Sequence, residues 1–392
     1  MIKSIKVMLK PNNKQKTKLF LYANTARFAY NWTIAKQQEN YQNGGKFIND
    51  STLRKHFTQM KKLDEFNWLN NVSNNVTKQA IKDACDAYKR FFKGLSKYPK
   101  FKSKKKSIPS FYQDNVKIKF TKTHVKVEGF ASSKKSNKQK INWIRLAEKG
   151  RIPFGENVKY MNPRFTFDGL NWWVSVGIET DSDYSPSKTE GIGIDLGIKD
   201  LAVCSDGKVY GNINKTKRIR QLEKKKRRLQ RKISRKYEKG REGNRYRKTN
   251  NIIKSEKKLL KVSRRLTNIR HNYIHQITSE IVNRKPMFIV LEDLNVKGMM
   301  KNKHLAESVQ QQCFHEFRRQ IEYKSNWNNI RFILADRWFP SSKLCSCCGK
   351  LKKDLKLSDR TFECGCGNIV DRDYQASINL KKYGENVLES AS

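Results

Sequence analysis

Two short apolar runs in this chain each end in a carboxylate. GIGID (191–195) ends in Asp195, and FIVLE (288–292) ends in Glu292. Short apolar runs bounded by glycine and charge are typical of buried strands. Helical periodicity lies between these runs and after them, so the alternation of strand and helix over 191–380 predicts an α/β domain.

A third acid, Asp373, stands where Ala376, Ile378 and Leu380 indicate the start of a helix. Taken singly, acids at strand ends often only cap helices or pair with lysine. A strand nevertheless carries its last residue to the rim of the sheet, where α/β folds bind ligands. Three converging carboxylates would repel one another unless cations neutralised them, and an all-oxygen set suits Mg²⁺. We therefore predict Asp195, Glu292 and Asp373 as catalytic residues that bind two Mg²⁺ ions for phosphodiester hydrolysis.

Five cysteines cluster near the C-terminus, and two pairs of them have metal-ligand spacing. Cys345 and Cys348 have two residues between them, whereas Cys364 and Cys366 have one. Cysteine pairs separated by about 15 to 20 residues are typical of zinc sites. Cys347 is surplus and could replace Cys345 as a ligand. Because four thiolates leave no open coordination position, we predict one structural Zn²⁺ here.

The net charge of +48 arises from 84 Lys and Arg residues against 36 Asp and Glu. A charge of this size opposes compaction unless a polyanion neutralises it, which favours nucleic acid as the partner. No apolar run reaches the ~18 residues of a membrane span, so we expect no membrane partner and a cytoplasmic location. Between Lys217 and Arg270 there are 24 Lys and Arg, four Glu and no Asp, on the pattern of a helical hairpin. A solvated coiled-coil arm usually carries compensating Glu–Lys pairs, so we interpret this hairpin as a nucleic-acid clamp.

The first 180 residues change hydrophobic period twice. SIKVMLKP (4–11) alternates as a strand does, 12–95 repeats every three or four residues as about three helices do, and 108–180 alternates again. Within this last range 116–120 is expected to be a strand, and a hairpin turn is expected at 168–169. We expect a small antiparallel barrel or sheet that the first strand joins, with the helices inserted in it.

A basic loop, KYPKFKSKKKS (97–107), follows the helices and has aromatic rings between its lysines. Such runs are often only solvated surface, but interleaved rings favour contact with both backbone and bases. Arg360 is either an ordinary arginine of the cysteine loop or a contact to the scissile phosphate. The residues expected to contact nucleic acid are Tyr98, Lys100, Phe101, Lys102, Lys104, Lys105, Arg227, Arg228, Arg231 and Arg360.

Four segments, in this order, resemble the TnpB family, the transposon-encoded ancestors of type V CRISPR effectors. They are GIDLG (193–197), IVLEDLNVKGM (289–299), FPSSKLCSCCG (339–349) and CGCGNIVDRDYQASINL (364–380). The resemblance implies an RNA-guided DNA endonuclease that binds a transposon-end RNA and cuts double-stranded DNA beside a short flanking motif. It implies a RuvC-type nuclease of RNase H-like fold whose acids correspond to Asp195, Glu292 and Asp373. It also implies a bacterial or archaeal, nucleoid-associated protein, which we expect to act as a monomer with one RNA.

The resemblance extends over nearly the whole chain and implies a domain for each part of it. The expected domains are a wedge β-barrel at 1–11 and 108–182, a recognition helical module at 12–107, a RuvC-like nuclease domain at 191–344 and 367–392 that contains a basic helical hairpin at 217–281, and a zinc-ribbon-like loop at 345–366 that binds target nucleic acid. The polar segment 181–190 is expected to be a linker.

Two departures from the family pattern bear on activity. The family usually has DRDxNAA, whereas this chain has DRDYQAS, so Gln375 replaces an asparagine and could hold Asp373 less well. The second cysteine pair is C-x-C rather than the commoner C-x-x-C. Two alternatives to a guided endonuclease stay open at this point: a guided DNA-binding regulator that does not cut, and a guide-independent, structure-selective nuclease of the same fold.

Overall fold

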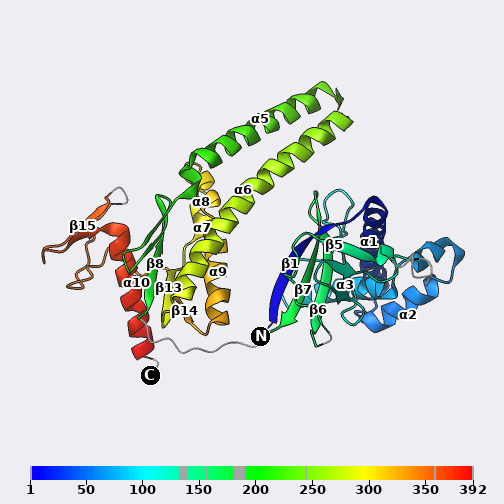
Figure 1. Ribbon diagram of the computed structural model, residues 1–392, viewed down its shortest axis with the longest axis horizontal. Helices are drawn as coiled ribbons and strands as arrows, with labels where there is room; N and C mark the ends of the chain where they lie inside the picture. The colour runs from blue at the N-terminus through cyan, green and yellow to red at the C-terminus, as the bar shows by residue number, and fades with distance from the viewer. Residues whose placement is uncertain are drawn as a thin grey trace. The chain divides into compact units, whose positions relative to one another are not determined.

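The computed structural model describes residues 2–131, 140–155, 157–180, 190–243, 245–356 and 359–390. The chain divides into two compact units, Met1–Asp181 and Ser182–Ser392 (Figure 1). Apart from Glu190, the predicted linker at 181–190 lies outside the described residues. No helix in the described part of the chain is both long enough and apolar enough to cross a membrane.

A seven-stranded antiparallel sheet forms one layer of the first unit, in the order β2-β6-β7-β1-β5-β4-β3. Its strands are β1 (Ile2–Lys10), β2 (Ser110–Tyr112), β3 (Lys119–Phe120), β4 (His124–Lys126), β5 (Trp143–Leu146), β6 (Tyr160–Phe167) and β7 (Trp172–Glu179). The N-terminal strand β1 pairs with β7 and with β5, so its predicted place in the sheet is confirmed. The described strands form an open order with β2 and β3 at its ends, and closure into a barrel stays a prediction.

Three α-helices separate β1 from β2 along the chain, as the periodicity predicts. The helices of this unit are α1 (Asn13–Gln42), α2 (Asp50–Met60), the 3-10 helix η1 (Asp64–Asn71), α3 (Asn74–Phe92) and the short 3-10 helix η2 (Lys140–Asn142). Pro11 follows β1, and Asn12 then caps α1 through a reciprocal hydrogen-bond pair with Gln15. Buried residues along α1, including Leu19 and Ile34, join one apolar core with the inner face of the sheet.

One predicted strand in this unit is wrong. Val116 is 81% exposed and lies in a turn, so the strand expected over 116–120 is reduced to the two residues of β3. The Asp114 carboxylate accepts the backbone N–H groups of Val116 and Lys117, at 3.0 and 3.2 Å. This local side-chain bond offers the backbone an alternative to strand pairing. The hairpin turn predicted at 168–169 is confirmed, with Gly169 at φ +89° between β6 and β7.

A five-stranded mixed sheet, in the order β10-β9-β8-β13-β14, forms the centre of the second unit. Its strands are β8 (Ile192–Leu196), β9 (Asp200–Cys204), β10 (Val209–Gly211), β13 (Phe288–Glu292) and β14 (Arg331–Ala335). The neighbours β8, β13 and β14 are parallel to one another, whereas β9 pairs antiparallel with both β8 and β10. The predicted alternation of strand and helix in this region is confirmed.

Helices α6 (Asn250–Asn283) and α9 (Phe314–Trp327) cover one face of this sheet, and α10 (Arg372–Glu389) covers the other (Figure 1). The other helices of this unit are η3 (Ile213–Lys215), α5 (Lys217–Lys239), α7 (Val296–Met299) and α8 (Ala306–Gln312). One face packs Ile194 and Leu291 against α6 and α9, and the other packs Phe288 and Val290 against α10. Successive strand residues therefore alternate between two buried cores, which explains the nearly continuous apolar runs.

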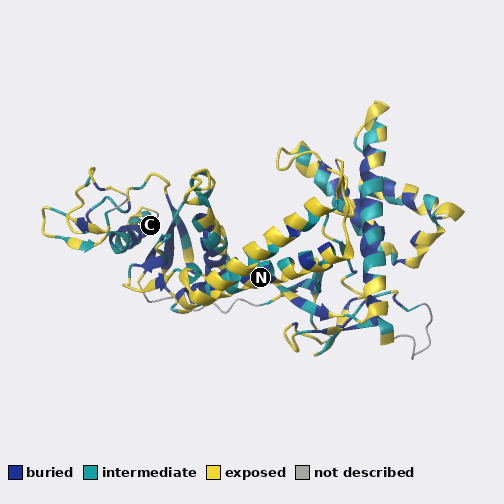
Figure 2. Cartoon of the chain, turned by 90° about the horizontal axis from the view of Figure 1, so that it is seen from above, coloured by how far each residue is buried: buried dark blue, intermediate teal, exposed yellow. Residues whose placement is uncertain are grey.

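The predicted basic hairpin is present as α5 and α6, joined by the short strands β11 (Arg241–Glu242) and β12 (Arg245–Tyr246). Ile219, Val262 and Leu266 form its buried seam, and most of α5 is exposed (Figure 2). The C-terminal half of α6 continues into the core under the sheet through Ile274 and Ile281. The hairpin is thus an extension of the helix that packs under the second sheet.

Candidate active site and cysteine cluster

The register of two parallel strands brings Asp195 and Glu292 to the same edge of the second sheet. Ile194 pairs with Leu291, so the next residue on each strand is one of the acids. In a parallel pair, residues at the same level point to the same face. Both carboxylates therefore face the α10 side of the sheet, opposite the side that buries Ile194 and Leu291.

Helix α10 lies on this face and carries Asp373 in its first turn. The contact is close at Gly193, where a Cβ would collide with the carbonyl oxygen of Ser377 and the backbone nitrogen of Lys381. Gly384, further along α10, leaves space for the rings and methyl groups of Phe288 and Val290. Helix backbone occupies the space beside Gly193, so the packing of α10 requires a glycine at this position.

The charges of the acids act on one another, although the three side chains do not form a group within 4.8 Å of the kind that four cysteines form. Burial, together with the charges of Asp373 and Glu292, raises the pKa of Asp195 to about 8, and Arg372 opposes this shift. Burial raises the pKa of Glu292 as well, with a contribution from Asp293. A carboxylate set of this kind is ionised together only beside cations, and its all-oxygen donors could hold a divalent ion such as Mg²⁺.

Asp371 and Asp373, the two aspartates of DRD (371–373), make different hydrogen bonds. Asp371 is the N-cap of α10, and its carboxylate accepts the backbone N–H groups of Asp373 and Tyr374 at 2.9 and 3.1 Å. Asp373 is left to accept from the Arg372 guanidinium at 2.9 Å. Arg360 lies 3.8 Å from the other oxygen of Asp373. This predicted phosphate contact therefore stands beside the acids.

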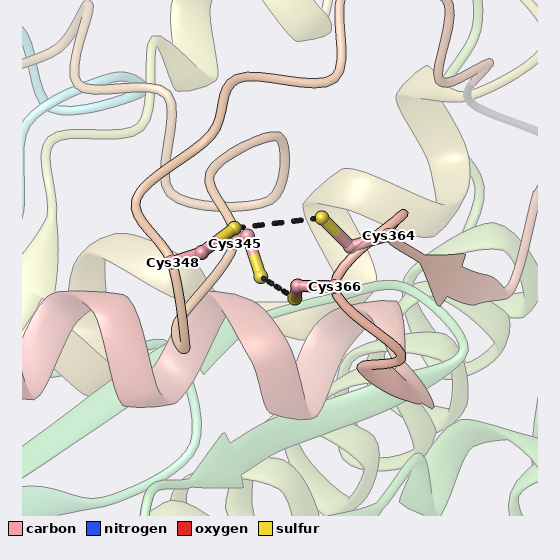
Figure 3. Close-up of side chains that lie close together, drawn as sticks. All are labelled: Cys345, Cys348, Cys364 and Cys366. Carbon is pink, nitrogen blue, oxygen red and sulfur yellow. Dashed lines mark hydrogen bonds between the residues drawn. The ribbon is translucent and has the colours of Figure 1, made fainter.

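The four predicted zinc ligands lie together on one side of α10 (Figure 3). The sulfurs of Cys345, Cys348, Cys364 and Cys366 are all within 4.8 Å of one another. The Cys345–Cys366 and Cys348–Cys364 sulfurs are each 3.6 Å apart. A tetrahedral zinc site with bonds near 2.3 Å has sulfurs about 3.8 Å apart, so the group could hold a structural metal ion. Cys347 is exposed and lies outside the group.

Both cysteine pairs sit in glycine turns. Gly349 follows Cys348 at φ +71°, and Gly367 follows Cys366 at φ +88°. Backbone N–H groups of Cys347 and Cys348 and the Asn368 side chain face the sulfur of Cys345. Burial opposes the ionisation of that thiol, but these donors lower its pKa to about 6. The Asn368 backbone favours the Cys366 thiolate, but hydrogen bonds with Cys348, Cys364 and Cys345 raise the pKa of Cys366 to about 12. The four thiols therefore ionise together only around a cation.

The segment 344–371, called the cysteine loop here, is attached directly to α10. Its strands β15 (Thr361–Glu363) and β16 (Ile369–Asp371) pair, and β16 runs into the helix at Asp371. The buried Gln375 amide donates to the Leu344 carbonyl at 2.7 Å and accepts from Ser346 and Asn368 at 3.0 and 3.3 Å. These partners belong to the cysteine loop, so the expectation that Gln375 would hold Asp373 does not describe its contacts.

The residues predicted to contact nucleic acid lie in both units and differ in how far their side chains are exposed and in what they contact. Tyr98 packs edge-on against Tyr88 and Phe91, whereas Phe101, Lys100, Lys104 and Lys105 are exposed. Lys102 is half-buried, with its ammonium 3.5 Å from the centre of the Tyr30 ring and its backbone bonded to the Asn31 side chain. This position makes Lys102 part of the packing of the first unit.

The α5 candidates border a continuous cationic surface. Arg227 forms an ion pair with Glu307 at 2.9 Å. Arg228 and Arg231 line a shallow groove whose lining is entirely basic. The six residues of this groove, the α5 groove below, are Arg228, Arg231, Lys232, Arg235, Lys236 and Lys239.

Sequence reasoning missed four residues that shape the site. Asp293, directly after Glu292, pairs with Arg318 at 2.9 Å and with Arg337. Arg372 pairs with Asp373. Asp293 and Arg372 each stand directly beside a predicted catalytic acid, which is the signal that could have indicated these two. No sequence signal indicates the tertiary partners themselves.

Three family models match segments of this chain. One described as "Helix-turn-helix domain" matches residues 1–46, one described as "Probable transposase" matches 174–303, and one described as "Cas12f1-like, TNB domain" matches 314–380. In the first segment the described residues 2–46 contain a single α-helix, α1, after the strand β1.

Curated relatives match over nearly their whole length. "Putative RNA-guided DNA endonuclease" of Streptomyces pristinaespiralis is 29% identical over 382 residues, covering 97% of this chain and 89% of that protein. "Putative RNA-guided DNA endonuclease InsQ" of Escherichia coli (strain K12) is 27% identical over 407 residues, covering 99% and 93%. Among solved structures, the one described as "Cryo-EM structure of the Cas12f1-sgRNA-target DNA complex" is similar with a TM-score of 0.62 at 13% identity, covering 97% of this chain and 98% of that one. This likeness shows a shared fold.

Proposed function

Because the chain belongs to the TnpB family of transposon-encoded proteins, we propose that it is an RNA-guided DNA endonuclease. Its guide is an RNA derived from the transposon end, and its target is double-stranded DNA beside a short flanking motif. Base pairing with the guide reads the sequence, and the protein reads duplex shape and the flanking motif, the division of labour known for guided nucleases.

The observation that carries this proposal is the gathering of carboxylates on the α10 face of the second sheet. Asp195 and Glu292 stand level on neighbouring strands, and Asp373 contributes to the raised pKa of Asp195. A protein that only bound nucleic acid would gain nothing from concentrating negative charge where phosphates lie. The strand order and the helices on both faces support the RNase H-like fold expected for a RuvC-type nuclease.

Asp195, Glu292 and Asp373 are the residues that would hold two Mg²⁺ ions. Their donors are all oxygen, and the raised pKa of Asp195 indicates that the group lacks the positive charge that full ionisation requires. When bound, such ions polarise the scissile phosphate and make a water more acidic. The four clustered cysteines would hold one structural Zn²⁺.

The remaining chemistry belongs to protein cations. Arg372 orients the Asp373 carboxylate through a hydrogen bond of 2.9 Å. Arg360 has a half-exposed side chain beside the same carboxylate, so it can contact a phosphate that approaches the acids. The α5 groove and the exposed lysines of the 97–107 loop offer charge for RNA and DNA backbones.

The names of the parts follow from the same proposal. The sheet of the first unit acts as the wedge, α1 to α3 act as the recognition module, and the cysteine loop lies within the nuclease domain beside its last acid. The complex contains one protein chain and one RNA.

The test is DNA cleavage by the protein purified with its own RNA. The copurifying RNA is sequenced, and plasmids that carry the matched target beside randomised flanks are incubated with the complex and Mg²⁺. We expect cutting that depends on Mg²⁺, on the guide match and on a flanking motif. Asp195→Ala should abolish cutting, by roughly 1,000-fold or more, while the matched variant Glu322→Gln at an exposed acid of α9 should cut normally.

Two results would contradict the proposal and point to a different function. Guide-dependent binding of the target without any cut would indicate a DNA-binding regulator. Cutting that persists after the RNA has been removed would indicate a guide-independent, structure-selective nuclease.

A further inference from the structure

Trp338 is the most exposed large hydrophobic side chain among the described residues, at 85%. An indole ring in water forgoes the stabilisation that burial of its large apolar area would provide. The ring follows β14 by three residues, in the segment DRWFP (336–340). A side chain of this size at such a position requires a reason beyond packing.

The backbone around Trp338 is fixed on both sides. The Asp336 carboxylate accepts the backbone N–H of Trp338 at 2.8 Å, and the Asp336 carbonyl accepts that of Phe339 at 3.1 Å. The Phe339 ring packs against Tyr383 of α10, with centroids 4.9 Å apart. On the other side, the Arg337 guanidinium donates to the Asp293 carboxylate. The turn therefore holds the indole outward instead of leaving it in a loose loop.

The same contacts locate Trp338 at the edge of the sheet that carries the acids. Ala335, the last residue of β14, pairs with Glu292 across the sheet. Arg337 contacts Asp293, the residue directly after Glu292, and Tyr383 lies further along α10, the helix that carries Asp373 in its first turn. Each side of the Trp338 turn is thus attached to an element that carries a predicted catalytic acid.

We propose that Trp338 stacks on an unpaired base of the DNA strand that reaches the acids and positions that strand for cutting. This inference rests on the proposed nuclease function and adds to it a substrate-positioning side chain. A nucleobase fits better than a protein partner, because the exposed ring is flanked by the exposed, charged Asp336 and Arg337 rather than by other apolar side chains. Stacking on an aromatic ring is open to every base, which suits an enzyme whose sequence reading is done by the guide.

Photocrosslinking tests the contact without requiring any cleavage. Target DNA with 5-iodouracil at successive positions is bound to the protein–RNA complex in a chelator, irradiated and mapped by mass spectrometry. We expect one position to crosslink to the peptide that contains Trp338. Trp338→Phe should retain this crosslink, and Trp338→Ala should lose it.

Kinetics test whether the contact positions the strand. At saturating complex, Trp338→Ala should lower the single-turnover cutting rate roughly ten-fold, the order expected for one lost stacking contact, with unchanged binding of target DNA. Trp338→Phe should restore most of the rate. An abasic nucleotide at the crosslinked position should slow the native protein similarly and should not slow Trp338→Ala further. Tyr41→Ala, which removes an aromatic ring that is 81% exposed in the first unit, is the matched control and should cut at the native rate.

The inference is wrong if bound DNA crosslinks elsewhere but at no position to the Trp338 peptide. It is equally wrong if Trp338→Ala cuts at the native rate, or if the peptide crosslinks to a protein instead of DNA. If the native complex gives the Trp338 crosslink but does not cut with Mg²⁺, the base contact stands and the proposed endonuclease function fails. Melting temperature and zinc content, which a fully exposed side chain should not alter, verify that each variant is folded.

Discussion

The second unit contains two groups of side chains that could hold cations, and they are built in opposite ways. The four cysteines come from one loop, and the glycine turns at Gly349 and Gly367 aim them at one another. The three acids come from β8, β13 and α10, which meet only because the sheet and helix pack. The comparison teaches that a local site depends on turn chemistry, whereas a distributed site depends on every close contact beneath it.

The largest expected effect is loss of the metal from the cysteine loop. Cys348→Ser should reduce zinc from about one ion per chain to nearly none, because a closed tetrathiolate site needs all four ligands. Hydrogen exchange should rise over 344–371, while the core beneath α10 stays protected. Cys347→Ser is the matched control, since this exposed thiol lies outside the group. Equal zinc loss in both variants would mean that Cys347 is a ligand and that the ligand set is wrong.

A second prediction concerns a change that disturbs the acids and leaves the cysteine group intact. Gly193→Ala introduces a Cβ that must push α10 off the sheet, because the obstructing atoms are helix backbone. We expect a loss of about 1–3 kcal/mol of unfolding free energy and weaker Mg²⁺ binding by calorimetry, with zinc content unchanged. Gly365→Ala is the control from the cysteine loop, because a Cβ there meets open space. Native Mg²⁺ affinity in Gly193→Ala would show that the acids do not depend on this contact.

A third, smaller effect concerns the connection between the two groups. Gln375→Ala removes an amide that ties α10 to the loop and leaves the Leu344 carbonyl with one hydrogen bond fewer. The expected cost is about 1–3 kcal/mol in unfolding free energy, typical of a disrupted buried hydrogen bond. Zinc should exchange faster, as measured by transfer to a chromophoric chelator, and Mg²⁺ affinity should change little. A selective loss of Mg²⁺ affinity would instead return Gln375 to the role of supporting Asp373.

The same contrast explains what could be predicted from the sequence. Spacing indicated Cys348, Cys364 and Cys366 and left Cys345 or Cys347 as the fourth ligand, because ligands of a local site are close in the chain; the structure groups Cys345 with the other three. The helices of the first unit and the basic hairpin followed from periodicity, which local burial imposes. The strand predicted at Val116 is absent because the Asp114 side chain competes for the backbone there.

Tertiary packing accounts for features that no local pattern predicts. The glycine at position 193 is required by the contact with α10, which starts far along the chain. Gln375 bonds to Leu344 and Ser346, 31 and 29 residues away, as well as to the nearby Asn368. The ammonium of Lys102 lies over the Tyr30 ring. A sequence pattern indicates that a residue type is unusual at a position, but the partner that explains it is fixed only by folding.

The last prediction is a difference in the sign of the pH dependence of stability between the two groups when metals are absent. The folded pKa of Asp195 is about 8 against an ordinary value of 3.8, so between these values the folded state binds the extra proton and stability falls as pH rises. The pKa of Cys345 is lowered to about 6 from 9.0, so between these values the unfolded state binds the extra proton and stability rises with pH. In chelator, urea unfolding from pH 5 to 9 should give a shallower fall for Asp195→Asn and a weaker rise for Cys345→Ser. Mg²⁺ should remove the Asp195 dependence alone and release a proton at pH 7, detected by calorimetry in buffers of different ionisation enthalpy. An Asp195→Asn curve parallel to that of the native protein would mean that Asp195 is already ionised without a cation, and the contrast between the crowded acids and the stabilised thiolate would not hold.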